Sequence, residues 1–401
     1  MSRPTRLHPA DVLGFSRLAL NATSGMVGLV EAMHRTIAGD IPSETPAGAL
    51  IAGTTAAAYG TVDAITGLVG GGIDAILSSA SSTADEIEST PEREAMLAAV
   101  NGIVGDHLAA TQNPLAIPMR LRRYGRPLQL ERRHLAAAVA QPGSKLLVLV
   151  HGLCMNDLQW TRYGHNHGTA LADDLGWTPV HLHYNTGLHV STNGRAFAAL
   201  LEDLVGQWPA PVHELAIIGH SVGGLLARSA HYYGRAAGHR WPKYLQRLVF
   251  LGTPHHGSAL ERAGNWVNVL LGLTPYTSPL ARIASIRSAG ITDLRYGNLL
   301  DEDWQGTNRF HHAGDRRRPL PLPKRVRCFA IAANKGTNPG ELGQHFGDGL
   351  VSVDSALGRH ADPSQALLFS NSRQWVGHGM GHWDLLSHPA VYRQIRKWLA
   401  S

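Results

Sequence analysis

The chain has 401 residues, of which 44% are hydrophobic and only 16% charged, so it is a globular protein with a large core and not a disordered chain. The formal net charge is +6, but the basic residues are scattered, which excludes a nucleic-acid partner from the prediction. The densest basic run, Arg316–Arg318, is expected in a solvated loop. Cys154 and Cys328 are too few for a disulfide framework and are expected to be structural.

The first residues carry no clean apolar core and no small-residue cleavage site, so we predict no signal peptide. No stretch reaches the roughly 18–20 uninterrupted apolar residues of a membrane span. The nearest, 49–77, is glycine-rich and is interrupted by Asp63 and Asp74. These features predict a cytoplasmic protein, with association at a membrane surface as the alternative.

Residues 1–115 are predicted to form an N-terminal helical extension rich in alanine and glycine. Apolar residues recur at steps of three and four between Val62 and Ile76, which is one face of a helix. A second helix is expected to start near Ser89, with Pro91 in its first turn. Three interpretations stay open: packing on or capping the following domain, which we favour, peripheral membrane contact, or oligomerisation. The sequence specifies no oligomeric state.

The pattern changes after residue 115. The segment 118–130 alternates around Tyr124-Gly125 and predicts a hairpin. Short apolar runs then alternate with helical patterns. The expected strands are 145–150, 179–184, 214–219, 247–252, 325–332 and 366–370, and the expected helices are 194–207, 223–233 and 389–400. Continuous apolar strands with intervening helices predict an α/β fold with a mostly parallel central sheet.

The interval of about 258–323 has no clear strand pattern and is predicted to be a cap or lid insertion over the ends of the strands. It contains Trp266 and Tyr276, which, with Trp160, are candidates for pocket residues, although such aromatic residues more often belong to the core. Residues 116–401, with this insertion included, are predicted to form the second domain.

The segment Gly219-His220-Ser221-Val222-Gly223 fits the pattern G-x-S-x-G, and it lies between a predicted strand and a predicted helix. That context is the one in which the pattern marks a nucleophilic serine on a sharp turn. Glycines on both sides leave room for the turn, and the backbone N–H of Val222 faces the same space as the hydroxyl. The alternative is a plain strand-to-helix turn; we favour Ser221 as a nucleophile.

A nucleophilic serine needs a base and an orienting acid, which follow it in this chain order. Asp348 stands between two glycines after a predicted strand and is the candidate acid, with Asp354 as its competitor. His382 precedes an apolar helical run and is the candidate base, with His378 as the second choice. His388 directly precedes Pro389 and is expected to begin the last helix.

A second donor for an oxyanion is expected after an earlier strand. His151-Gly152 ends the 145–150 strand, and Gly152 allows the N–H of Leu153 to turn toward the site. We therefore predict Leu153 and Val222 as the two donors, against the alternative of a plain turn at the end of the strand.

Residues 116–401 resemble α/β-hydrolases of the lipase and esterase type. The resemblance rests on "HGL" at 151–153, "GHSVGG" at 219–224, "GTPHHGS" at 252–258, "DGLV" at 348–351 and "HWDLL" at 382–386. In these motifs the chain is similar to bacterial triacylglycerol lipases and to glycosylphosphatidylinositol inositol-deacylase-like hydrolases. The resemblance implies Ser221, Asp348 and His382 as a catalytic triad, with Leu153 and Val222 as the oxyanion hole.

The resemblance further implies that no cofactor is required. Some of these lipases hold a structural calcium ion with an aspartate that Asp384 matches, but the second aspartate has no counterpart between residues 316 and 347. We therefore predict no metal.

The predicted function is a serine carboxylic-ester hydrolase, an esterase or lipase, that acts on an acyl-ester or lipid-like substrate. An acyltransferase or amidase with the same triad, and a non-catalytic lipid-binding homologue of the hydrolases, are the alternatives.

Overall fold

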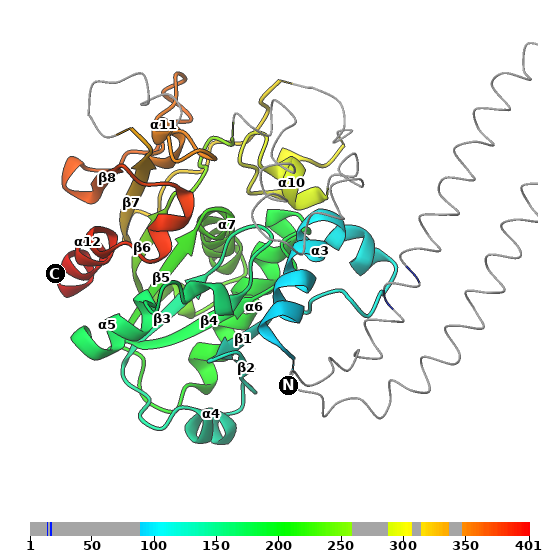
Figure 1. Ribbon diagram of the computed structural model, residues 1–401, viewed down its shortest axis with the longest axis vertical. Coiled ribbons are helices and arrows are strands. Elements are labelled where there is room, and N and C mark those ends of the chain that lie inside the picture. The colour runs from blue at the N-terminus through cyan, green and yellow to red at the C-terminus, as the bar shows by residue number, and fades with distance from the viewer. Residues whose placement is uncertain (1–13, 15–16, 18–88, 259–287, 307–313, 337–346) are drawn as a thin grey trace, which may run out of the picture. The chain divides into compact units, whose positions relative to one another are not determined.

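The computed structural model describes residues 14, 17, 89–258, 288–306, 314–336 and 347–401 (Figure 1). The chain divides into two compact units, residues 1–89 with 108–116, and residues 90–107 with 117–401. The helix face at 62–76, Trp266 and Tyr276 lie outside the described residues. The division into an extension of residues 1–115 and a catalytic domain of residues 116–401 stays a prediction, as does the cap at about 258–323.

The second unit is built on an eight-stranded sheet in the order β2-β1-β4-β3-β5-β6-β7-β8. The strands are β1 (Arg120–Arg123), β2 (Arg126–Pro127), β3 (Lys145–Val150), β4 (Thr178–His183), β5 (Glu214–His220), β6 (Leu245–Leu251), β7 (Arg327–Asn334) and β8 (Gln374–His378). The first two form the predicted hairpin, and β1 also pairs antiparallel with β4. All other pairs are parallel, so the predicted mostly parallel sheet is confirmed.

Helices cover both faces of this sheet (Figure 1). One face packs its alternating apolar residues on α5 (His167–Leu175) and α12 (Pro389–Ala400), which contribute Leu171, Val391, Ile395 and Trp398 to one core cluster. On the other face α6 (Val190–Gln207) and α7 (Val222–Ala236) pack against each other and α7 packs on β5. The central strands are buried on both sides, which explains their continuous apolar sequences.

The remaining helices of the described residues are α3 (Pro91–Ala110), α4 (Arg132–Ala138), α10 (Ala289–Asp293) and α11 (Val353–Ala356), with short 3-10 turns between other elements. Pro91 is the first residue of α3, as predicted, and Thr90 Oγ1 accepts the N–H of Arg93 at 3.2 Å. Within the described residues, no helix combines the length and the apolar character needed to cross a membrane.

The expected strand at 366–370 is wrong, because the last strand is β8 at 374–378. Leu368 is 90% exposed, so this apolar run does not enter the sheet. Phe369 instead packs its ring against Phe250 and His255, at centroid distances of 5.9 and 5.7 Å. A short apolar run looks the same whether it pairs as a strand or anchors a loop through single side chains.

Buried histidines, of which His151, His167 and His181 are examples, make the stability of the fold depend on pH. Burial lowers the pKa of His151 to about 3 and the pKa values of His167 and His181 to about 4. These groups bind protons more readily in the unfolded chain, so their contribution to stability is intact above the ordinary histidine pKa and is lost as the pH falls below it.

Below pH ~6.5, each of these histidines is expected to lower the free energy of unfolding by about 1.4 kcal/mol per pH unit until its folded-state pKa is reached. Chemical denaturation between pH 7 and pH 4 measures this slope. His181→Gln should make the slope shallower, whereas a slope that does not change would contradict the assignment.

Candidate active site

Ser221 connects β5 to α7 in a strained conformation. Its φ and ψ are 54° and −125°, a region that residues with a side chain rarely adopt. Two backbone hydrogen bonds hold it there: the Ser221 N–H donates to the carbonyl of Leu251 at 2.8 Å, and the N–H of Gly224 donates to the Ser221 carbonyl at 3.0 Å. This strand–serine–helix turn has the form of a nucleophile elbow.

The two glycines of the G-x-S-x-G segment are required by close backbone contacts. A Cβ atom on Gly219 would lie 2.5 Å from the backbone nitrogen of Gly224, and one on Gly223 would lie 2.3 Å from the carbonyl oxygen of Val150. Neither neighbour is a flexible side chain, so the turn cannot accept a methyl group without moving β3 or α7.

Gly223→Ala is therefore expected to lower the free energy of unfolding by about 2–3 kcal/mol, the cost of forcing extra volume into packed backbone. Urea denaturation measures it. Gly314→Ala is the matched control, because a Cβ there meets no atom within 4 Å. Equal stability of the two variants would show that the turn is not tightly packed.

Asp348 and His382 form a buried pair. The carboxylate Oδ2 lies 2.6 Å from the Nδ1 of His382, and both side chains are at most 3% exposed. The other oxygen, Oδ1, accepts the N–H groups of Leu350 and Val351 at 2.9 and 2.8 Å. The carboxylate is thus fixed on one side by the backbone and accepts the Nδ1–H of the imidazole on the other, which leaves Nε2 as a base.

The glycines on both sides of Asp348 have positive φ values, 57° at Gly347 and 96° at Gly349, which residues with a side chain rarely adopt. His382 is held at its backbone as well, because its N–H donates to the carbonyl of Asp348 at 3.2 Å. The carboxylate of Asp384 accepts the N–H of Gly381 at 2.8 Å and so fixes the turn that begins at His382. The local backbone therefore sets the position of the imidazole.

Gly252 packs against His382 and directly follows the residue that binds the backbone of Ser221. It follows Leu251, whose carbonyl binds the Ser221 N–H, and a Cβ on Gly252 would lie 3.1 Å from both Cε1 and Nδ1 of His382. Among the described residues the hydroxyl of Ser221 donates no hydrogen bond to His382. In enzymes without bound substrate a catalytic contact of this kind is often long and tightens only when the substrate binds.

The competing acid and bases lie apart from the pair. Asp354 is exposed and lies 3.2 Å from Arg359, and His378 is exposed at the end of β8. His388 caps α12, accepting the N–H of Ala390 at 3.2 Å, as expected of a residue that begins a helix.

Leu153 and Val222 place two backbone N–H groups beside Ser221. A Cβ on Gly152 would lie 3.0 Å from the Ser221 Cβ, so the loop after β3 lies directly against the serine. Leu153 and Val222 are each 2% exposed, and in the described part of the chain no acceptor receives their N–H groups. Buried N–H groups without a partner are rare, so these two are suited to receive an oxyanion.

Two features of the site are not evident from the sequence. Cys154 adopts a φ of 58°, with its N–H donated to Thr186 Oγ1 at 3.1 Å, and this strained residue fixes the loop of Leu153. His220 is fully buried and donates its Nε2–H to the carbonyl of His382 at 3.2 Å. Burial and then His382 hold the pKa of His220 well below its ordinary value. In the sequence, only the position of His220 next to Ser221 could have indicated that it belongs to the site.

Trp160, a candidate for a pocket residue, is fully buried in the core cluster that packs on α5 and α12. Both cysteines are free thiols, and burial raises the pKa of Cys328 to about 12.

The sheet order, the helices on both faces and the strained turn at Ser221 define an α/β-hydrolase fold. A family model described as the PGAP1-like alpha/beta domain matches residues 198–315. This segment includes the Ser221 turn and "GTPHHGS".

Solved structures similar to this chain include two lipases and a thioesterase. Lipase BlEst2 of Bacillus licheniformis in its mature form is 20% identical to this chain. The match covers 65% of this chain and 93% of the lipase chain, with a TM-score of 0.42. Lipase B of Aspergillus fumigatus is 14% identical, covering 66% and 57%, with a TM-score of 0.38. Human thioesterase 2 is 10% identical, covering 64% and 95%, with a TM-score of 0.35. Comparison with curated protein sequences gives no significant match.

Proposed function

We propose that the protein is a serine carboxylic-ester hydrolase in which Ser221 is the nucleophile, His382 the base and Asp348 the orienting acid. The observation that carries this proposal is the buried Asp348–His382 pair, packed through Gly252 against the strand end that binds the Ser221 N–H. A buried carboxylate bonded to an imidazole Nδ1 beside a strained serine is the arrangement that acyl transfer needs.

The reaction proceeds in two steps. Ser221 Oγ attacks the ester carbonyl while its proton passes to Nε2 of His382, and Asp348 stabilises the resulting imidazolium. The N–H groups of Leu153 and Val222 bind the oxyanion of the tetrahedral intermediate. The alcohol leaves with the proton from His382, and water, activated by the same imidazole, then cleaves the acyl-enzyme and releases the carboxylic acid.

We propose an acyl ester of lipid-like character as the substrate, because apolar side chains border the site. Leu153 and Val222 carry the two oxyanion donors, and Leu385 lies against Gly252. An acyl acceptor other than water, or an amide substrate, would use the same residues. The cytoplasmic location and the membrane contact of the N-terminal extension stay predictions.

Labelling with a fluorophosphonate tests the proposal, since only an activated serine reacts with it. The expected result is one adduct, on the peptide that contains Ser221, together with hydrolysis of p-nitrophenyl esters. The series from acetyl to palmitoyl gives the preferred chain length, and an added alcohol separates hydrolysis from acyl transfer. Absence of both the adduct and turnover would favour the non-catalytic alternative.

A further inference from the structure

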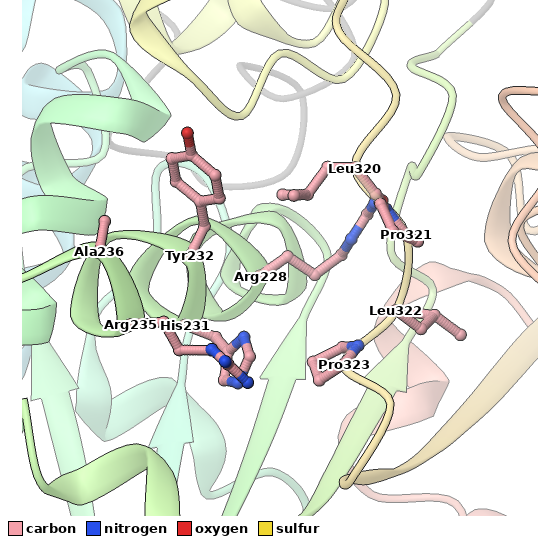
Figure 2. Close-up of a pocket in the computed structure, with 9 residues that line it drawn as sticks. All are labelled: Arg228, His231, Tyr232, Arg235, Ala236, Leu320, Pro321, Leu322 and Pro323. Atoms are coloured by element: carbon pink, nitrogen blue, oxygen red, sulfur yellow. The ribbon is translucent and has the colours of Figure 1, made fainter. Parts of the chain in front are cut away.

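A groove of about 370 Å³ lies between the second half of α7 and the segment 320–323 (Figure 2). Small-molecule sites are typically about 300–1,000 Å³, so this groove can hold a small ligand. One wall consists of Arg228, His231, Tyr232, Arg235 and Ala236 from α7, and the other of Leu320, Pro321, Leu322 and Pro323. Apart from the two arginines, the lining is largely aliphatic, aromatic and proline side chains.

The groove contains a buried positive charge. Arg228 is only 5% exposed, and Figure 2 shows its side chain reaching from α7 toward Leu320 and Pro321. Its Nη2 donates to the carbonyl of Leu320, and its Nη1 lies 3.3 Å from Nδ1 of the neutral ring of His255. Its buried Nε has no partner, and no carboxylate of the described residues pairs with it. Buried charges are ordinarily paired, so this one is unusual.

The neighbouring charges do not neutralise Arg228. Arg317, which was expected in a solvated loop, is instead buried and pairs with Asp315 at 2.7 Å. Asp303 favours the charged guanidinium of Arg228 from a distance but forms no ion pair with it, and its carboxylate accepts the N–H groups of Leu299 and Leu300. Burial, and then Arg317, lower the pKa of Arg228 to about 9, so the guanidinium still carries its charge at neutral pH.

The groove is separate from the site at Ser221. Arg228 follows Ser221 by seven residues along α7 and Ala236 by fifteen, which at ~1.5 Å per residue places the α7 wall of the groove about 10–22 Å away along the helix axis. None of the residues that line the groove belongs to the proposed triad or oxyanion hole.

We propose that this groove binds a monoanionic amphiphile with a single chain, a fatty carboxylate, with its head group at Arg228 and its chain along residues 320–323. One unpaired buried guanidinium matches one negative charge, and a dianionic phosphate would add a second charge to be desolvated. The volume is near the lower end for ligand sites, which suits one chain rather than two.

The other polar residues of the lining do not replace Arg228 as the anion receptor. Burial lowers the pKa of His231 to about 4, so its ring is neutral at pH 7. Arg235 is exposed in the last turn of α7, where a cation is already favoured by the helix dipole.

Calorimetric titration of the full chain with sodium decanoate, kept below its micelle concentration, tests the proposal. We expect saturable binding with one site. Arg228→Gln should weaken the binding of decanoate by about tenfold or more, because a charge-assisted hydrogen bond is lost. Ala236→Trp should abolish it, because the indole fills the groove. Lys243→Gln, which removes an exposed positive charge outside the groove, is the matched control and should bind as the wild type does.

Decanol tests the need for charge and should bind at least about tenfold more weakly than decanoate, since it lacks the ionised head group. Binding that persists in Ala236→Trp, equal binding of decanol, or no saturable binding of decanoate would each overturn the proposal. If Arg228→Gln does not fold, as judged by circular dichroism, Ala236→Trp decides the outcome. None of these results depends on whether Ser221 is catalytic.

Discussion

Ser221→Ala is expected to lower kcat for p-nitrophenyl ester hydrolysis on the order of 10⁶-fold. In the proposed mechanism this change removes the nucleophile and with it the acyl-enzyme route, so any rate above the uncatalysed reaction comes from oxyanion binding and substrate positioning alone. The fold should survive, because the contacts that hold the turn are made by the backbone of Ser221 and not by its hydroxyl.

Steady-state kinetics and mass spectrometry after fluorophosphonate treatment measure this effect. Ser229→Ala is the matched control on the same helix. Its buried hydroxyl donates to the carbonyl of Leu299 at 2.7 Å, so its loss should reduce stability while kcat stays near the wild-type value. Retention of more than a few per cent of kcat by Ser221→Ala would exclude Ser221 as the nucleophile.

His382→Ala is expected to reduce kcat by about 10⁴–10⁶-fold, because it removes the proposed base for the proton of Ser221. Oδ2 of Asp348 would then lose its hydrogen bond to the imidazole, so a modest loss of stability should accompany the loss of rate. His378→Ala provides the comparison, since His378 lies four residues earlier and is exposed.

Stopped-flow measurement of the p-nitrophenolate burst separates acylation from later steps in both variants. We expect no burst from His382→Ala and a normal burst from His378→Ala. The opposite result would assign the base to His378 and would mean that the Asp348–His382 pair is purely structural.

The sequence pattern predicted the central elements closely, for example the strand at 145–150 and the helix at 389–400. These segments combine an unbroken apolar run or a clear helical period with sharp boundaries, such as Pro389 at the first helical position. The turn at Ser221 and the pairing of Asp348 with His382 were also accessible from the sequence, because the fold constrains where each residue type can stand.

Other features depend on contacts between distant segments, which a local pattern does not encode. The burial of Arg317 follows from its pairing with Asp315 and its bond to the carbonyl of His255, at 3.0 Å. Similarly, the strain at Cys154 is held by Thr186, 32 residues later in the chain. Phe369 is anchored by ring contacts with Phe250 and His255, which no periodicity could reveal.

The order of the strands has a consequence for how the protein folds. Leu153, Ser221, Asp348 and His382 follow different parallel strands, and every parallel pair joins segments that are remote in sequence. Closing such long loops costs entropy before the pairing offsets it, so parallel sheets of this kind form slowly. We infer that β7 and β8 must dock before His382 can reach Ser221. The four residues therefore assemble late, and reactivity at Ser221 during refolding would report completion of the whole sheet.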